Sequence, residues 1–203
     1  KNESPKAEGQ DPGYVSSTLH NKVKENDVIE LSAPTGNFFL FNPEKTNVLI
    51  SAGIGLTPMM AMLNQLLTGN TDPNEKVTLW EKIKANFNKP EPKNPINFIH
   101  AVRNSRVHAM KEMMQDSSKK HDNLNVFVAY EQTDSKDVLG RDYHAEGRLN
   151  LKQLDAKMLP KDADYYLCGP IPFMQVQHKA LLELGIPAQN IHSEAFGTGG
   201  VAL

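Results

Sequence analysis

The chain has 203 residues, of which 39% are hydrophobic and 23% are charged, with a formal net charge of -2. This length and composition are typical of a globular protein with a sizeable core, and the near-neutral charge gives no reason to expect nucleic acid as a partner. No apolar run is long enough to span a bilayer, and the polar start at 1–13 lacks the apolar stretch of a signal peptide, so we expect a cytoplasmic protein without a membrane partner.

The first part of the chain predicts little regular structure. Residues 1–13 are typical of a loop, and two short strands are expected at 28–32 and 37–41, joined by a turn at 34–37. Two strands cannot close a barrel. Because the chain begins with Lys1 and not with Met, we expect that it starts inside a longer protein.

From Asn47 onward, short apolar runs alternate with helical periods. This alternation indicates parallel α/β units. The expected strands of the sheet lie at 48–51, 96–101, 126–130, 165–168 and 191–195.

Helices are predicted between these strands from apolar residues that share one face. The first such face carries Met59, Leu63, Leu66 and Leu67, and the second carries Phe173, Val176, Ala180, Leu181 and Leu184. A shorter helix is expected with Asn150 as N-cap and with Leu151, Leu154 and Met158 on its face. The segment 71–95 is predicted to be a surface insertion around one short helix at 77–87.

The strand at 48–51 runs into a glycine turn and then into a helix. Gly53 and Gly55 allow backbone angles closed to other residues and let a ligand approach the main chain, while Thr57 suits an N-cap and Pro58 suits the first helical position. The free amides at such a helix start attract an anion. A pyrophosphate site is therefore predicted over Gly53, Ile54, Gly55, Leu56, Thr57 and Pro58. Since Pro58 replaces the third glycine of the dinucleotide fingerprint, a merely tight turn remains an alternative.

Three motifs follow one another along this part of the chain: ISAGIGLTPM at 50–59, YLCGP at 166–170 and IHSEAFG at 191–197. Together they resemble the ferredoxin-reductase-type family. The ending, and the upstream GYVSSTLH at 13–20, narrow the resemblance to the reductase modules of flavohaemoglobins. It covers nearly the whole chain except the insertion.

The resemblance implies a fold with two parts. A flavin-binding antiparallel β-barrel would precede an α/β domain with a five-stranded parallel sheet in the order 3-2-1-4-5, flanked by helices. We therefore expect a partial FAD-binding barrel at 1–44 and an NAD(P)-binding domain at 45–203. The family's Arg-x-Tyr-Ser flavin motif is absent from the chain and would precede Lys1.

The resemblance also implies roles for particular residues. The glycine turn would hold the pyrophosphate of the nicotinamide dinucleotide, and Cys168 would lie by the nicotinamide, although a small core side chain is the alternative for this cysteine. Glu194 would lie near the reactive edge of the flavin, or else face water at a strand end, and Phe196 would cover the flavin ring. The remaining residues implied in cofactor binding are Gly13, Val15, Ser16 and Ser17 at the flavin pyrophosphate, where serine N-capping is the alternative, and Gly169, Pro170, Ala195, Gly197 and Thr198.

Arg103 and Arg106 follow the second strand, where the adenosine ribose is expected. A cation there could accept a 2′-phosphate, but surface arginines are commonly solvated, so we expect NADH as the family default. Histidines show no metal-ligand spacing, and His100, His108 and His144 are expected to be structural or exposed. Cys168 as the only cysteine cannot supply an iron–sulfur cluster, and no metal site is expected.

The activity implied by the resemblance is hydride transfer from NAD(P)H to FAD, followed by electron transfer to haem b in a globin domain of the same polypeptide. The parent protein would act as a nitric oxide dioxygenase that detoxifies nitric oxide to nitrate. Nothing in the chain indicates a haem site. The alternatives are a free flavin reductase, the reductase component of another oxygenase, and an inactive nucleotide-binding fragment.

Overall fold

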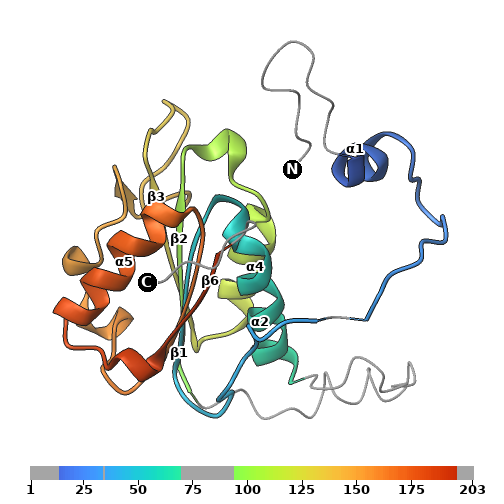
Figure 1. Cartoon of the computed structure of the whole chain (residues 1–203). Coiled ribbons are helices and arrows are strands. Elements are labelled where there is room, and N and C mark those ends of the chain that lie inside the picture. Colours follow the sequence, from blue (N-terminus) through green and yellow to red (C-terminus); the bar gives the residue numbers. More distant parts are fainter. Residues whose placement is uncertain (1–13, 34, 70–93, 196–203) are drawn as a thin grey trace. The chain divides into compact units, whose positions relative to one another are not determined.

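The computed structural model describes residues 14–33, 35–69 and 94–195 (Figure 1). The chain divides into two compact units, Lys1–Asn37 and Phe38–Leu203. Its helices and strands are α1 (Tyr14–Asn21), β1 (Asn47–Ala52), α2 (Leu56–Thr68), β2 (Ile96–Val102), α4 (Lys111–Lys120), β3 (Leu124–Tyr130), β4 (Ala145–Glu146), β5 (Asp164–Cys168), α5 (Ile171–Glu183) and β6 (Ile191–Glu194). Short 3₁₀ helices are η1 (Gly53–Gly55), η2 (Ser105–Val107), η3 (Leu151–Gln153), η4 (Ala156–Met158) and η5 (Ala188–Asn190).

The predicted strands at 28–32 and 37–41 are wrong. No strand occurs over the described residues from 14 to 46, and Val28 and Leu31 are 95% and 82% exposed. An extended segment becomes a strand only when a neighbour pairs with its backbone and one of its faces is covered. Val28 and Leu31 have neither a paired strand nor a covered face in the described part of the first unit.

A parallel sheet in the order β4-β3-β2-β1-β5-β6 forms the second unit. Without the two-residue β4, this order is the predicted 3-2-1-4-5, so the α/β class and the arrangement of the main strands are confirmed. The short β4 was not predicted. It extends the sheet beside the end of β3, where Tyr130 pairs with Glu146.

The core lies on both faces of this sheet. Along β1, Leu49 belongs to the apolar cluster that contains Met59 of α2 and Met114 of α4, whereas Val48 and Ile50 belong to the cluster on the α5 side. Figure 1 shows α2 and α4 on one side of the sheet and α5 on the other. Because successive strand residues point to opposite faces, a strand covered on both sides is a continuous apolar run.

Several helix predictions need correction. The buried face of α5 carries Met174 and Leu181, while Val176 is 61% exposed and does not lie on it. The expected helix after Asn150 is instead the pair η3 and η4, and the Asn150 side chain accepts a hydrogen bond from the Lys152 backbone. Helix α4 was not predicted, since its sequence is polar with Met114 as its only buried residue. The predicted helix at 77–87 lies outside the described residues.

The segment before β1 is attached to β5. The Phe41 amide donates a hydrogen bond of 2.8 Å to the Tyr166 hydroxyl. Asp164 accepts hydrogen bonds from Asn42 at 2.6 Å and from Lys45 at 3.0 Å. These hydrogen bonds join the segment to the sheet. The predicted boundary at 44/45, between a flavin-binding and a nicotinamide-binding domain, remains a prediction.

Candidate functional site

The glycine turn lies at the C-terminal end of β1, the central strand around which the sheet is built. Gly53 has a φ of +54°, and an ideal Cβ on it would meet no atom within 4 Å. Ile54 is 51% exposed, so the turn is open to solvent. The first amides of a helix have no acceptor within that helix and carry the positive end of its dipole. Glycine at position 53 thus provides both the left-handed backbone and the open space that a phosphate group needs.

Gly55 has a different reason to be glycine from the one expected. Its φ is −59°, which any residue adopts. An ideal Cβ on Gly55 would lie 2.2 Å from the Cys168 carbonyl oxygen, and one on Gly169 would lie 3.2 Å from the Ala52 nitrogen. The two glycines therefore let the ends of β1 and β5 approach each other, and the expectation that Gly55 supplies special backbone angles is wrong.

Two details of the predicted helix start are also wrong. Helix α2 begins at Leu56 with Gly55 as N-cap. Thr57 therefore lies inside the helix, where its hydroxyl donates a 3.0 Å hydrogen bond to the Ile54 carbonyl, and Pro58 is not the first helical residue. The 3₁₀ turn η1 extends the helix backward to Gly53, which a motif read from the sequence does not reveal.

Cys168 ends β5 and is fully buried, with a relative exposure of 0%. It pairs with Ser51 of β1 on one side and with Glu194 of β6 on the other. Burial raises the pKa of the Cys168 thiol to about 12, and the negative charge of Glu194 adds to this increase. The thiol is therefore protonated near neutral pH and cannot act as a nucleophile.

The other predicted residues of this edge have different environments. Pro170 is exposed and is the N-cap of α5, Glu194 is exposed at the end of β6, and Ala195 packs partly against the core. Val15, Ser16 and Ser17 lie in the first turn of α1, in the other compact unit. Gly13, Phe196, Gly197 and Thr198 lie outside the described residues.

Arg103 and Arg106 follow β2 as expected, but their environments differ. Arg103 is exposed, and within residues 14–33, 35–69 and 94–195 no ion pair involves it. The Arg106 guanidinium lies 2.8 Å from a carboxylate oxygen of Asp134, in the loop after β3. The pKa of the Asp134 carboxyl is lowered by this hydrogen bond from Arg106.

A buried histidine, His100, and a half-buried one, His108, lie close together near these loops, and both were expected only to be structural or exposed. His100 of β2 is 1% exposed, and its Nδ1 lies 2.9 Å from the Ser51 hydroxyl. The ring centroid of His108 lies 5.4 Å from that of His100, and its Nδ1 lies 2.8 Å from the Tyr130 hydroxyl. Burial lowers the pKa of His100 to about 3 and that of His108 to about 4, so both are neutral near pH 7. A histidine inside the apolar strand at 96–101 was the available sequence signal for this pair.

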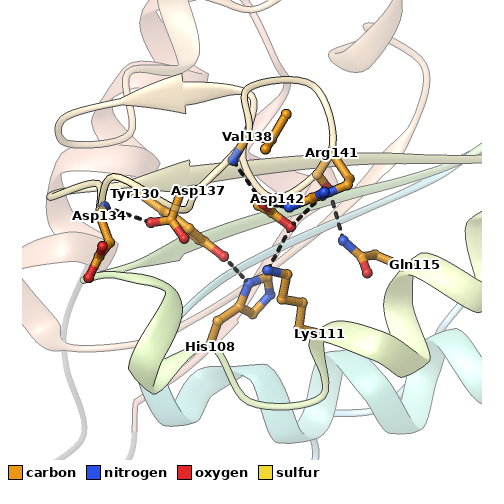
Figure 2. Close-up of polar contacts among 9 residues, drawn as sticks. All are labelled: His108, Lys111, Gln115, Tyr130, Asp134, Asp137, Val138, Arg141 and Asp142. Carbon is orange, nitrogen blue, oxygen red and sulfur yellow. Dashed lines mark hydrogen bonds and ion pairs between the residues drawn. The ribbon is translucent and has the colours of Figure 1, made fainter.

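Sequence reasoning did not identify Asp142, a buried carboxylate that Figure 2 shows near His108 and Lys111. Asp142 accepts hydrogen bonds from the Val138 amide at 2.8 Å and from Arg141 at 2.7 Å, and its other oxygen lies 2.7 Å from Lys111. The hydrogen bonds from Arg141 and Lys111 lower the pKa of the Asp142 carboxyl. This network attaches the start of α4 to the loop between β3 and β4, and therefore supports the edge that carries Asp134.

Metal-ligand clusters and membrane-spanning helices are both absent from the described residues. Clusters of three or more histidine, cysteine, aspartate or glutamate side chains able to hold a metal ion do not occur in the described part of the chain. Among the helices of the described ranges, none combines the length and apolar composition that crossing a membrane requires.

Known proteins resemble the chain over most of its length, although the chain spans less than half of its curated relatives. The flavohemoprotein of Bordetella pertussis is 43% identical over 195 residues, which are 96% of this chain and 43% of that protein. The flavohemoprotein of Rhizobium meliloti is 40% identical over 187 residues, which are 92% of this chain and 41% of that protein.

Solved structures with a similar fold also match the chain. The flavohem-like FAD/NAD binding domain of nitric oxide dioxygenase from Vibrio cholerae O1 biovar El Tor has a TM-score of 0.68 and 34% identity, covering 92% of this chain and 66% of that one. The flavohemoglobin from Malassezia yamatoensis, with bound FAD and heme, has a TM-score of 0.60 and 25% identity, covering 85% of this chain and 39% of that one. Residues 49–179 match the family model described as the oxidoreductase NAD-binding domain. The chain therefore belongs to the oxidoreductase NAD-binding domain family, and flavohemoproteins are among the relatives that it resembles over nearly its whole length.

Proposed function

We propose that the chain is the reductase module of a flavohaemoglobin, which binds NAD(P)H and passes its hydride to FAD. The observation that carries this proposal is the open turn at Gly53, with its left-handed backbone, at the carboxyl end of the central strand. Open parallel sheets bind ligands at this edge. Family membership and the FAD/NAD binding named for the Vibrio cholerae domain support the same reading.

Different residues at this end of the sheet would bind different parts of the dinucleotide. The amides of the turn would hold its pyrophosphate. Gly169 and Pro170, which follow β5 where it lies close to the end of β1, would contact the nicotinamide. Cys168 contributes a neutral buried side chain that excludes water and places no charge beside the ring. Arg103 would lie by the adenosine ribose.

Other residues would contact the flavin. We propose that Glu194 lies near the reactive edge of the isoalloxazine and that Phe196 covers the ring. The further contacts would come from Gly13, Val15, Ser16 and Ser17, and from Ala195, Gly197 and Thr198. Bound FAD would supply the chemistry that accepts a hydride and releases electrons singly, whereas the protein supplies the positions of the reacting groups.

The complete protein would carry out a longer reaction. We propose that the electrons pass to haem b in a globin domain of the same polypeptide, and that the protein detoxifies nitric oxide in the cytoplasm by dioxygenation to nitrate. The names of the curated relatives and the FAD and heme bound in the Malassezia yamatoensis protein support this extension.

Anaerobic titration tests the reductase function. The purified chain is loaded with FAD, NADH is added without oxygen, and absorbance of the oxidised flavin is followed. We expect bleaching. Bound NADH without bleaching would instead indicate a nucleotide-binding module with no reductase activity, and failure to bind any nicotinamide dinucleotide would overturn the proposal.

A matched pair of variants tests the turn itself. Gly53 and Gly140 both have positive φ, and an ideal Cβ on either meets no atom within 4 Å. Substitution by alanine strains both backbones by about 1 kcal/mol. Only Gly53→Ala places a methyl group where the pyrophosphate would bind, so we expect it to weaken NADH binding about tenfold or more, while Gly140→Ala leaves the affinity unchanged.

A further inference from the structure

The loops that follow β2 and β3 continue side by side beyond the ends of the strands. The Glu131 amide donates a 3.0 Å hydrogen bond to the Val102 carbonyl, and the Gln132 amide donates one of 2.9 Å to the Arg103 carbonyl. These bonds bring the residues after β3 next to the arginines after β2. A side chain from the second loop can therefore act on a ligand at the end of β2.

Asp134 is the side chain that does so. Its carboxylate lies 2.8 Å from the Arg106 guanidinium. The loop fixes the backbone of Asp134, because the Asp134 amide donates a 2.8 Å hydrogen bond to the Asp137 carboxylate and the Asp137 amide donates one of 2.9 Å to the Asp134 carbonyl (Figure 2). The charge of Arg106 is thus balanced by a carboxylate that a hydrogen-bonded turn of the loop carries.

The end of β2 is where a dinucleotide bound at the glycine turn would place its adenosine ribose. Strand β2 is the neighbour of β1, with Ala52 opposite Ala101. In open α/β sheets, an acidic residue near this point accepts from the ribose 2′-hydroxyl of NAD, whereas an arginine accommodates the 2′-phosphate of NADP. A guanidinium that already has a carboxylate partner offers less to a phosphate group.

The balanced charges of the two loops also disfavour binding of a 2′-phosphate. Segments 103–107 and 131–137 contain as many cations as anions: Arg103, Arg106 and Lys136 against Glu131, Asp134 and Asp137. A phosphate dianion gains little from a surface whose charges cancel, and Asp134 would repel it at short range.

We propose that Asp134 is a specificity-determining residue, which holds Arg106 in an ion pair and thereby makes the site select NADH over NADPH. This inference rests on the proposed binding of NAD(P)H. It assigns the selection to a residue after β3 and not to the arginines alone. It implies that the negative charge of Asp134 accounts for the preference for NADH over NADPH.

Binding measurements on the 203-residue chain test it without relying on turnover. Dissociation constants for NADH and NADPH are measured by calorimetry for the parent chain and for Asp134→Asn, which keeps the size of the side chain but removes its charge. We expect the affinity for NADPH relative to NADH to rise about tenfold, the effect of one charge-assisted hydrogen bond. Adding Arg106→Gln to this variant should abolish the gain.

A matched control is Asp122→Asn, which removes an exposed carboxylate just before β3, at the opposite edge of the sheet. It should leave the ratio of affinities unchanged. If both coenzymes bind and Asp134→Asn does not alter their ratio, or if the gain survives Arg106→Gln, the role of Asp134 is overturned while the proposed function stands. If neither coenzyme binds to the parent chain, the proposed function fails and this inference fails with it.

Discussion

Gly55 and Cys168 lie so close that a Cβ on Gly55 would come within 2.2 Å of the Cys168 carbonyl oxygen and within 2.4 Å of its carbonyl carbon. The obstacle is backbone at the end of the fully buried strand β5, which cannot move aside as the tip of a flexible side chain does. The first turn of α2 and the end of β5 are therefore packed directly against each other, and their separation is set by the absence of a side chain.

Gly55→Ala should consequently destabilise the fold. We expect a loss of about 2–3 kcal/mol in the free energy of unfolding, because an extra methyl group must push two covered elements apart. Urea unfolding followed by circular dichroism measures it. Gly140→Ala, which meets no neighbour, should lose only about 1 kcal/mol from backbone strain. Equal stability of the two variants would contradict the packing argument.

The Cys168 thiol should be unreactive in the folded chain. It is completely buried and its pKa is raised to about 12, so neither access nor thiolate is available at pH 8. We expect an aromatic disulfide reagent to modify it on the order of 100-fold more slowly than in denaturing urea. Ser193→Cys, which adds a thiol at an exposed position of β6, should react at once under native conditions. Rapid labelling of Cys168 in the parent chain would show that the end of β5 opens.

Stability should fall on acidification while most carboxylates are still ionised. Burial, and then the neighbouring His108, lower the pKa of His100 from 6.5 to about 3. Between these values the unfolded chain binds a proton at His100 that the folded chain does not, so His100 alone lowers the free energy of unfolding by about 1.4 kcal/mol per pH unit as pH drops. His108, whose pKa is lowered to about 4, adds to this slope. Denaturant titrations between pH 7.5 and 4.5 measure the slope.

Replacing the histidine should flatten this dependence. His100→Asn is expected to be less stable than the parent chain at pH 7.5, because it loses packing, yet to lose less stability per pH unit below 6.5. Ser51→Ala removes the hydroxyl beside His100 and keeps the imidazole, so its slope should remain steep. A slope unchanged by His100→Asn would assign the acid sensitivity to another group.

Asp142 should be a major source of stability at the edge that carries Asp134. Its side chain is 4% exposed and is paired with Lys111 and Arg141. Asp142→Asn removes the carboxylate that Lys111 and Arg141 share and leaves both cations without this partner, and we expect a loss of about 3 kcal/mol in thermal or chemical unfolding. Asp116→Asn, which breaks an exposed pair with Lys119, should change stability by no more than about 0.5 kcal/mol. A loss that small for Asp142→Asn would mean that the network is not needed.

The main strands could be predicted because parallel strands covered on both faces are mostly apolar, as at 48–51 and 96–101. Their order was predicted from the family resemblance and not from this pattern. Helix α4 could not be predicted, since one buried residue, Met114, leaves no apolar stripe to detect. The strands expected at 28–32 and 37–41 do not form. Their composition suits a strand, but a strand exists only with a paired neighbour, and local sequence does not contain one.

The sequence by itself determined the strand, glycine turn and helix that make the proposed phosphate site, because backbone freedom at Gly53 and the apolar period after it are local properties. Only the tertiary structure decided that Gly55 meets Cys168, that His100 is buried beside Ser51 and that Arg106 meets Asp134. These partners are far apart in the chain, and the strand register that brings them together results from packing the whole sheet between its helices.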